Sequence, residues 1–193
     1  MHALQILLEE HQSLAAILHA IRYMLKEIGA GRVRPDLLLI RAMVHYLEAY
    51  PEQRHHPRED RFLFARLKDK TDEGKELLDQ LFAQHAGAGE RIKALEDALD
   101  VYERDLSKLA PLAAAFGTYA DFYRSHMLLE EREILPLLRK HFTEQDWAEI
   151  DAELAAEGNN LGGMPNENFS GVFSKLVAMA PEPIGLGMGP YKD

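Results

Sequence analysis

Two short stretches of this sequence repeat one pattern, and that pattern constrains the fold more than any other feature. The first stretch begins at His55 and the second at His126, and each histidine is followed four residues later by a glutamate, Glu59 or Glu130. An acidic residue, an arginine and apolar residues follow in both. On an α-helix, residues four apart lie on one face, about one turn apart. Each stretch can therefore present an imidazole and a carboxylate to one metal ion.

Four long segments carry apolar residues at helical spacing and are joined by short connections. They span residues 2–28, 35–70, 71–102 and 107–141. Pro51 and Pro57 lie inside the second segment, and each removes a backbone donor, so we expect a kink or a restart near Pro51. Long amphipathic helices with short connections are typical of an up-down-up-down four-helix bundle, so the sequence predicts an all-α fold.

The sequence after the fourth segment differs in character from the bundle. We expect residues 1–141 to form the four-helix bundle and residues 142–193 to pack on it. A short fifth helix is predicted over residues 146–156. The remaining tail is rich in Gly, Pro and Asn, and we expect loop with a short helix near residues 170–179.

The bundle topology places one histidine of each helix at a similar depth. The start of the first and third helices and the end of the second and fourth lie at one end of such a bundle. At a rise of about 1.5 Å per residue, the four histidines lie roughly 12–22 Å from that end. The two glutamates lie one turn nearer to it. The residues expected to converge in the core are His11, His55, Glu59, His85, His126 and Glu130.

The spacing of these histidines also indicates an internal duplication. The first two are 44 residues apart (55 − 11) and the last two are 41 apart (126 − 85). Residues 1–70 and 71–141 therefore look like two copies of one helical hairpin. A pseudo-twofold axis through the site would suit a pair of metal ions bridged by two carboxylates.

A metal centre explains these residues better than its alternatives. Burying two carboxylates without partners is very costly, and metal coordination removes that cost. The main alternative is a buried His–Glu hydrogen-bond network. The His-Glu-x-x-His motif of zinc proteases is absent. The Glu-x-x-His motif of ferritin-like di-iron proteins fits at Glu52 and His55 but fails at Tyr123 and His126.

Composition limits the ligands and partners available to the chain. It has 193 residues, a net charge of −10 and no cysteine. Any metal must therefore be held by histidine and carboxylate, which suit iron, manganese or zinc. The acidic charge disfavours nucleic acid and anionic membrane surfaces. We expect no signal peptide and no membrane-spanning segment, and hence a cytoplasmic protein.

Five other residues near the expected site have weaker claims to a role. His45 and Glu90 are expected on the surface or at its boundary. His56 follows a proposed ligand directly and should point roughly 100° away from it, behind the ligands or at the rim of the site. Tyr119 and Tyr123 lie one and two turns before a proposed ligand. They are expected to be core aromatics, with hydrogen bonding to a bound ligand as the alternative.

These residues resemble the haemerythrin-like, or HHE cation-binding, family over about residues 5–141. The matching segments are Glu10-His11, the run from His55 to Asp60, Gln84-His85, and His126-Met127 with Glu130-Glu131. The resemblance implies a four-helix bundle that holds two non-haem iron ions, bridged by an oxo or hydroxo group. It also implies which residues bind the metal. The ligands would be His11, His55, His85 and His126, with Glu59 and Glu130 bridging, and zinc or manganese as substitute metals.

The sequence departs from the oxygen-carrying haemerythrins at two positions. Those proteins have a second histidine four residues after the first on their third helix, where this chain has Gly89. Their last carboxylate is an aspartate five residues after its histidine, whereas Glu130 follows four after. These differences argue against reversible oxygen carriage. We expect Gly89 on the same face as His85, where it would leave either an open coordination position or room for close helix packing.

We therefore expect a non-haem di-iron protein that binds or reacts with a small oxidant, namely dioxygen, peroxide or nitric oxide. The alternative is a non-catalytic metal- or oxygen-sensing module whose bundle or tail changes order when iron binds. The sequence leaves open whether the protein is an enzyme, and whether it is a monomer or a homodimer.

Overall fold

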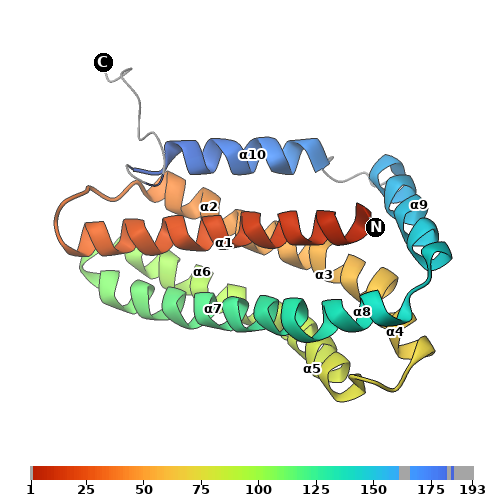
Figure 1. The fold of residues 1–193 in the computed structure, drawn as a ribbon. Helices are drawn as coiled ribbons and strands as arrows, with labels where there is room; N and C mark the ends of the chain where they lie inside the picture. The colour runs from red at the N-terminus through yellow and green to blue at the C-terminus, as the bar shows by residue number, and fades with distance from the viewer. Residues whose placement is uncertain (1, 161–165, 182–183, 185–193) are drawn as a thin grey trace.

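The computed structural model describes residues 2–160, 166–181 and 184, and nearly all of them are helical (Figure 1). No strand occurs among these residues. The helices, with π-helical and 3-10 segments labelled η, are α1 (His2–Gly29), α2 (Leu37–Tyr50), η1 (Pro51–His55), α3 (His56–Arg58), η2 (Glu59–Phe64), α4 (Ala65–Lys70), α5 (Lys75–Ala86), α6 (Ala88–Arg104), η3 (Leu106–Lys108), α7 (Leu109–Leu129), η4 (Glu130–Ile134), α8 (Leu135–His141), α9 (Glu144–Asn160) and α10 (Asn166–Met179).

Four helical rods pack into the expected bundle. Helix α1 packs against α2 and α7, and α6 packs against the same two helices on the other side. The rods run alternately up and down, as Figure 1 shows. The predicted all-α, up-down-up-down four-helix bundle is confirmed.

The second rod continues through Pro51 without a break, because the backbone changes to a wider helix there. Segments η1 and η2 are π-helical, and the N–H of His56 donates to the carbonyl of Pro51, five residues earlier. A proline removes one i→i−4 bond and its ring crowds the preceding turn, and a wider turn relieves both effects. The fourth rod has a matching π-helical segment, η4, at Glu130. Both repeated stretches therefore widen the helix at the glutamate.

The third rod is two helices rather than the single helix we expected over residues 71–102. Helix α5 ends at Ala86 and α6 begins at Ala88, with Gly87 between them in a non-helical conformation (φ −95°, ψ 2°). The side chain of Arg91 folds back to donate to the carbonyl of Gln84 across this break. Because of this break, side chains before and after Gly87 are not related by the angles of one continuous helix.

The two C-terminal helices cover the bundle and are longer than predicted. The carboxylate of Asp151 on α9 accepts bonds from the first backbone N–H groups of α1, at 3.2 Å from His2 and 2.7 Å from Ala3. Helix α10 lies along α1 and α2 (Figure 1). Its Leu176 is buried in the core. The Gly- and Pro-rich residues from 185 onward lie outside the described part of the chain.

A polar layer divides the apolar core of the bundle into two parts. One cluster lies towards the α1–α2 turn and includes Leu14, Met43, Leu95, Phe116 and Tyr123. The other lies towards the N-terminus of α1 and includes Leu7, Phe62, Leu81, Ile134 and Trp147. Along every rod, the residues between these clusters are the predicted histidines and glutamates. The site therefore lies inside the bundle, closed above and below by apolar side chains.

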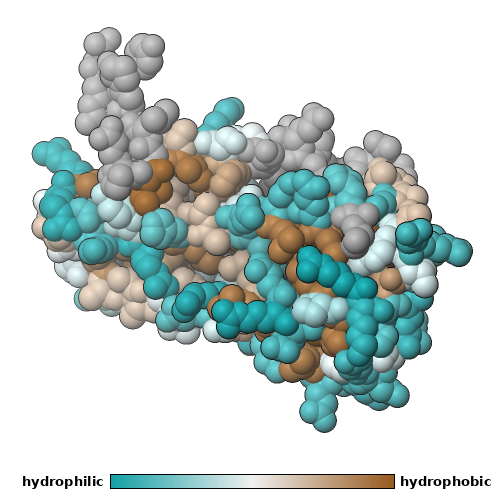
Figure 2. All heavy atoms as spheres, viewed as in Figure 1, coloured by the Kyte–Doolittle hydropathy of each residue, from teal (hydrophilic) through white to brown (hydrophobic). Residues whose placement is uncertain are grey.

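The outer surface is mixed in polarity. On the face drawn in Figure 2, hydrophilic residues are interspersed with separate hydrophobic areas. Among the described residues, no helix combines the length and the apolar composition that a bilayer crossing requires.

Two glycines should respond to alanine in opposite ways. Gly117 lies inside α7, and a Cβ there would meet no atom within 4 Å outside its own helix. Gly117→Ala should therefore raise the free energy of unfolding by about 0.5–1 kcal/mol, or about 1–4 °C in Tm. Gly74 has φ +78°, and its Cβ would lie 2.5 Å from Leu137 Cδ1. Gly74→Ala should destabilise the fold. Thermal melts of both variants test this, and a lower Tm for Gly117→Ala would contradict it.

Candidate metal centre

The structure brings the six predicted residues together in one buried layer. Each histidine comes from a different rod, and the side chains of all six are almost fully buried. The histidines form two pairs through their Nε2 atoms. These atoms are 3.1 Å apart in His11 and His55 and 3.3 Å apart in His85 and His126. In each pair, the two imidazoles come from the two rods of one hairpin.

The two glutamates lie between the histidine pairs and face both of them. Glu59 oxygens are 3.4 Å from Nε2 of His55 and 3.6 Å from Nε2 of His85. Glu130 oxygens are 3.2 Å from Nε2 of His11 and 3.3 Å from Nε2 of His126. Each glutamate therefore reaches both pairs, as a bridging carboxylate must.

The donor atoms form two four-residue sets that share the glutamates. In each set the donor atoms lie within 4.8 Å of one another. The sets are His11, His55, Glu59 and Glu130, and Glu59, His85, His126 and Glu130. Each set has the size and composition of a metal site built from imidazole and carboxylate.

The hydrogen bonding of the glutamates supports metal binding over the alternative network. Both oxygens of Glu59 and of Glu130 are buried, and none has a hydrogen-bond partner among the described residues. A buried carboxylate without hydrogen bonds is very costly, whereas a metal ion satisfies such oxygens directly. The residues present therefore fit a pair of metal ions.

Without metal, it is energetically unfavourable for both carboxylates to be charged. Burial and the facing charge of Glu130 hold the pKa of Glu59 well above its usual range. Burial acts in the same direction on Glu130, but the imidazoles of His11 and His85 outweigh it and lower its pKa. Two carboxylates this close share one proton, because like charges in a dry core repel strongly.

The outer nitrogen of each predicted histidine ligand has its own acceptor. In each ring Nδ1 lies 2.7–2.9 Å from a side-chain oxygen, so Nδ1–H donates and Nε2 faces the site, where it offers a lone pair once the ring is neutral. The pairs are His11 with Glu131, His55 with Glu10, His85 with Asp60, and His126 with Gln84. Such partners fix ring orientation in metal sites.

Sequence reasoning assigned no role to these four acceptors. Each of them directly adjoins a predicted ligand in the chain, yet it bonds a histidine of a different rod. Glu10 precedes His11 and bonds His55, for example, and also accepts from Tyr50 Oη at 2.6 Å. Their position next to a predicted ligand could have marked them as candidates. It does not predict which histidine ring each acceptor bonds.

His56 does not lie at the rim of the site, which was one of the two places expected for it. Its ring is buried in the layer and stacks on His85, with ring centroids 4.1 Å apart. The π-helical turn just before it reduces the angle between successive side chains, so His55 and His56 both face inward. Burial lowers the pKa of His56 to about 4, and the nearby rings of His85 and His55 act in the same direction.

The other four residues behave as the sequence predicted. His45 and Glu90 are exposed, and His45 pairs with Glu48 on the surface. Tyr119 and Tyr123 are buried core aromatics. The Tyr123 hydroxyl donates to Glu52 at 3.1 Å.

Both expectations for Gly89 were wrong. The residue is exposed, and a Cβ there would meet no atom within 4 Å outside its own helix, which excludes close packing. The break at Gly87 rotates α6 relative to α5, so position 89 leaves the face of His85. Ala88 is buried instead. Gly89 therefore leaves no coordination position at the centre.

Metal binding should stabilise the folded chain more strongly at pH 8.5 than at pH 6.5. Burial lowers the pKa of His85, but Asp60 and Glu130 outweigh it and raise the pKa to about 9, above the unfolded 6.5. The proton on His85 stabilises the metal-free fold, and this stabilisation is lost as the pH rises towards 9. The raised pKa of Glu59 likewise makes the metal-free fold less stable as the pH rises. Ligands must also lose their protons to bind metal.

Thermal melts with and without Zn²⁺ at both pH values measure this difference. Zinc at about 100 times its dissociation constant should add about 2.7 kcal/mol to the free energy of unfolding for each site that it occupies. Equal melting temperatures with and without metal would show that the carboxylates do not bind it.

Removing an outer acceptor should weaken metal binding without removing a ligand. Asp60 accepts from His85 Nδ1 at 2.7 Å, so Asp60→Ala frees that ring to rotate. Loss of such a partner typically costs 10–100-fold in metal affinity. Asp79→Ala, which removes an exposed carboxylate paired with Lys68, is the control and should leave affinity unchanged. Equal affinities by calorimetric titration with Zn²⁺ would contradict the role of Asp60.

Comparison with known proteins agrees with the geometry. Residues 2–138 match the hemerythrin HHE cation binding domain family. No curated protein and no solved structure matches the chain. The matched residues include the whole four-helix bundle and both donor sets, so the chain belongs to the hemerythrin HHE cation-binding domain family.

Proposed function

We propose that this chain holds two iron ions in its buried layer and that they bind or react with a small oxidant such as dioxygen, peroxide or nitric oxide. The observation that supports this most directly is the placement of two glutamates between two histidine pairs. Four inward Nε2 atoms and two shared carboxylates suit a pair of ions rather than one. Zinc and manganese would also be accepted by these donors.

Bound iron would supply the one-electron chemistry that small oxidants require. The chain supplies the setting for it. Its outer acceptors hold each imidazole in one tautomer, and its two apolar clusters exclude bulk water from the layer. A dry, apolar surrounding favours small uncharged ligands over anions and larger substrates.

A small cavity adjoins the site and matches a ligand of this size. It has a volume of about 20 Å³, enough for one water molecule. Its lining combines the charged or polar residues Glu10, His55, Arg58 and Glu59 with apolar residues that include Leu7, Phe62 and Leu154. A small oxidant could reach the His11–His55 end of the centre from this cavity.

The same cavity gives the sensing alternative a physical basis. Leu154 belongs to α9, which also holds the N-terminus of α1 through Asp151. A change at Glu59 on metal binding would be transmitted first to this helix. Iron-dependent protection of α9 from proteolysis, without turnover of any oxidant, would favour sensing over chemistry.

Reconstitution with ferrous iron under anaerobic conditions tests the proposal. We expect about two iron ions per chain by elemental analysis. Exposure to peroxide or nitric oxide should then change the near-ultraviolet and visible absorption. Zinc-loaded protein is the control and should show no such bands, because zinc has no redox chemistry.

Four outcomes separate the possibilities. Peroxide consumption over many turnovers would identify an enzyme, and a single spectral change without turnover would identify a binding or sensing protein. A consistent yield of one iron ion, or of none, would contradict the two-ion centre. Two ions with no response to any small ligand would contradict the oxidant function alone.

A further inference from the structure

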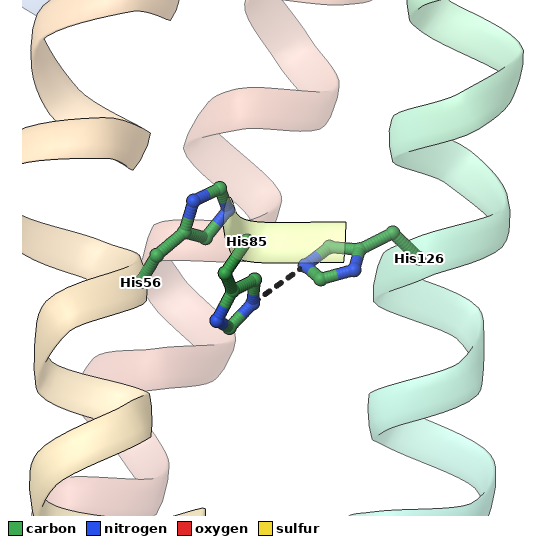
Figure 3. Close-up of side chains that lie close together, drawn as sticks. All are labelled: His56, His85 and His126. Atoms are coloured by element: carbon green, nitrogen blue, oxygen red, sulfur yellow. Dashed lines mark hydrogen bonds between the residues drawn. The ribbon is translucent and has the colours of Figure 1, made fainter. Parts of the chain in front are cut away.

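A fifth histidine lies in the same buried layer and has no role in the centre described above. His56 is the first residue of α3, and it is 3% exposed. Its ring centroid is 4.1 Å from that of His85 and 5.4 Å from that of His126. Figure 3 shows the three rings converging between their helices.

The nitrogens of His56 have no hydrogen-bond partner among the described residues. Buried polar atoms are nearly always satisfied, so an imidazole with two unsatisfied nitrogens needs an explanation. Stacking on His85 accounts for the position of the ring but not for its nitrogens. A phenyl ring would stack in the same place without leaving any polar atom unsatisfied.

A carboxylate also lies near Nδ1 of His56, beyond hydrogen-bond distance. Its Nδ1 faces Glu52, with Oε1 3.8 Å away. Glu52 is itself held by the Tyr123 hydroxyl, which donates to Oε1 at 3.1 Å. A carboxylate on the Nδ1 side leaves Nε2 as the free donor, as in the four predicted ligand rings.

We propose that His56 is a third imidazole ligand of the metal ion held by His85 and His126. This inference rests on the two-ion centre of the proposed function but not on any reaction with an oxidant. Glu52 and Tyr123 then act as positioning residues for the fifth imidazole.

The distances permit this assignment. Donor atoms of the three histidines lie within 4.8 Å of one another. Neighbouring ligands on one ion with bonds of about 2.1 Å are roughly 3 Å apart. A side-chain rotation that moves a donor by about 2 Å therefore brings His56 into coordination.

The inference makes the two metal positions unequal. Aligning the two halves of the sequence on His55 and His126 places Met127 at the position that matches His56. One ion then has three imidazoles and the other has two. The ion with fewer protein ligands is the one at His11 and His55, beside the cavity.

Nitrogen NMR of the zinc-loaded, ¹⁵N-histidine-labelled chain counts the coordinated rings directly. We expect five metal-bound imidazole nitrogens in the unmodified protein. Four would overturn the inference while leaving the two-ion centre in place. Five bound rings in a protein whose iron form ignores every small oxidant would uphold the inference and contradict the proposed function.

A variant identifies the fifth ring as His56. His56→Phe keeps an aromatic ring against His85 but removes both donors. Calorimetric titration with Zn²⁺ should show one site unchanged and the other weakened about tenfold or more, with one coordinated nitrogen signal lost. His45→Phe makes the same change at an exposed histidine and should alter neither site. Two unchanged sites in His56→Phe would overturn the inference.

Discussion

Two carboxylates that face each other in an apolar core are the constraint on which this structure depends. Glu59 and Glu130 are 1% exposed, and no described residue satisfies their oxygens. Metal ions offset that cost, and the surrounding elements make such binding possible. The core divides to admit a polar layer, the rods widen to π-helix at both glutamates, and every predicted histidine ligand has an acceptor behind it.

The repeated histidine spacing of the two hairpins accounts for the regular pairing of acceptors with histidine rings. It also shows where that regularity ends. Within each half, a residue before the first histidine bonds the second, as Glu10 does with His55. Between halves, a residue after each glutamate bonds the opposite hairpin, as Asp60 does with His85. His56 breaks this symmetry, because its counterpart is a thioether. The repeated hairpins thus place one donor set beside an additional imidazole and the other beside the small cavity.

Much of the fold and the six central residues followed from periodicity alone. Apolar spacing defines the four rods, and short connections define their alternation. Once topology is fixed, the position of a histidine along its helix gives its depth, because the rise per residue is constant. The predictions failed where the backbone departed from a regular α-helix. The break at Gly87 turned Gly89 outward, and the π-helical turn at Pro51 turned His56 inward.

The sequence by itself determined the bundle, the level of the site and the chemical type of its donors. Only the tertiary structure decided which acceptor holds which ring, how α9 closes the end of the bundle, and that a fifth imidazole lies in the layer. The physical reason is that helical periodicity depends on residues that are close together in the sequence. Contacts such as Glu131 with His11 join residues 120 positions apart, and they exist only after the rods have packed in one register.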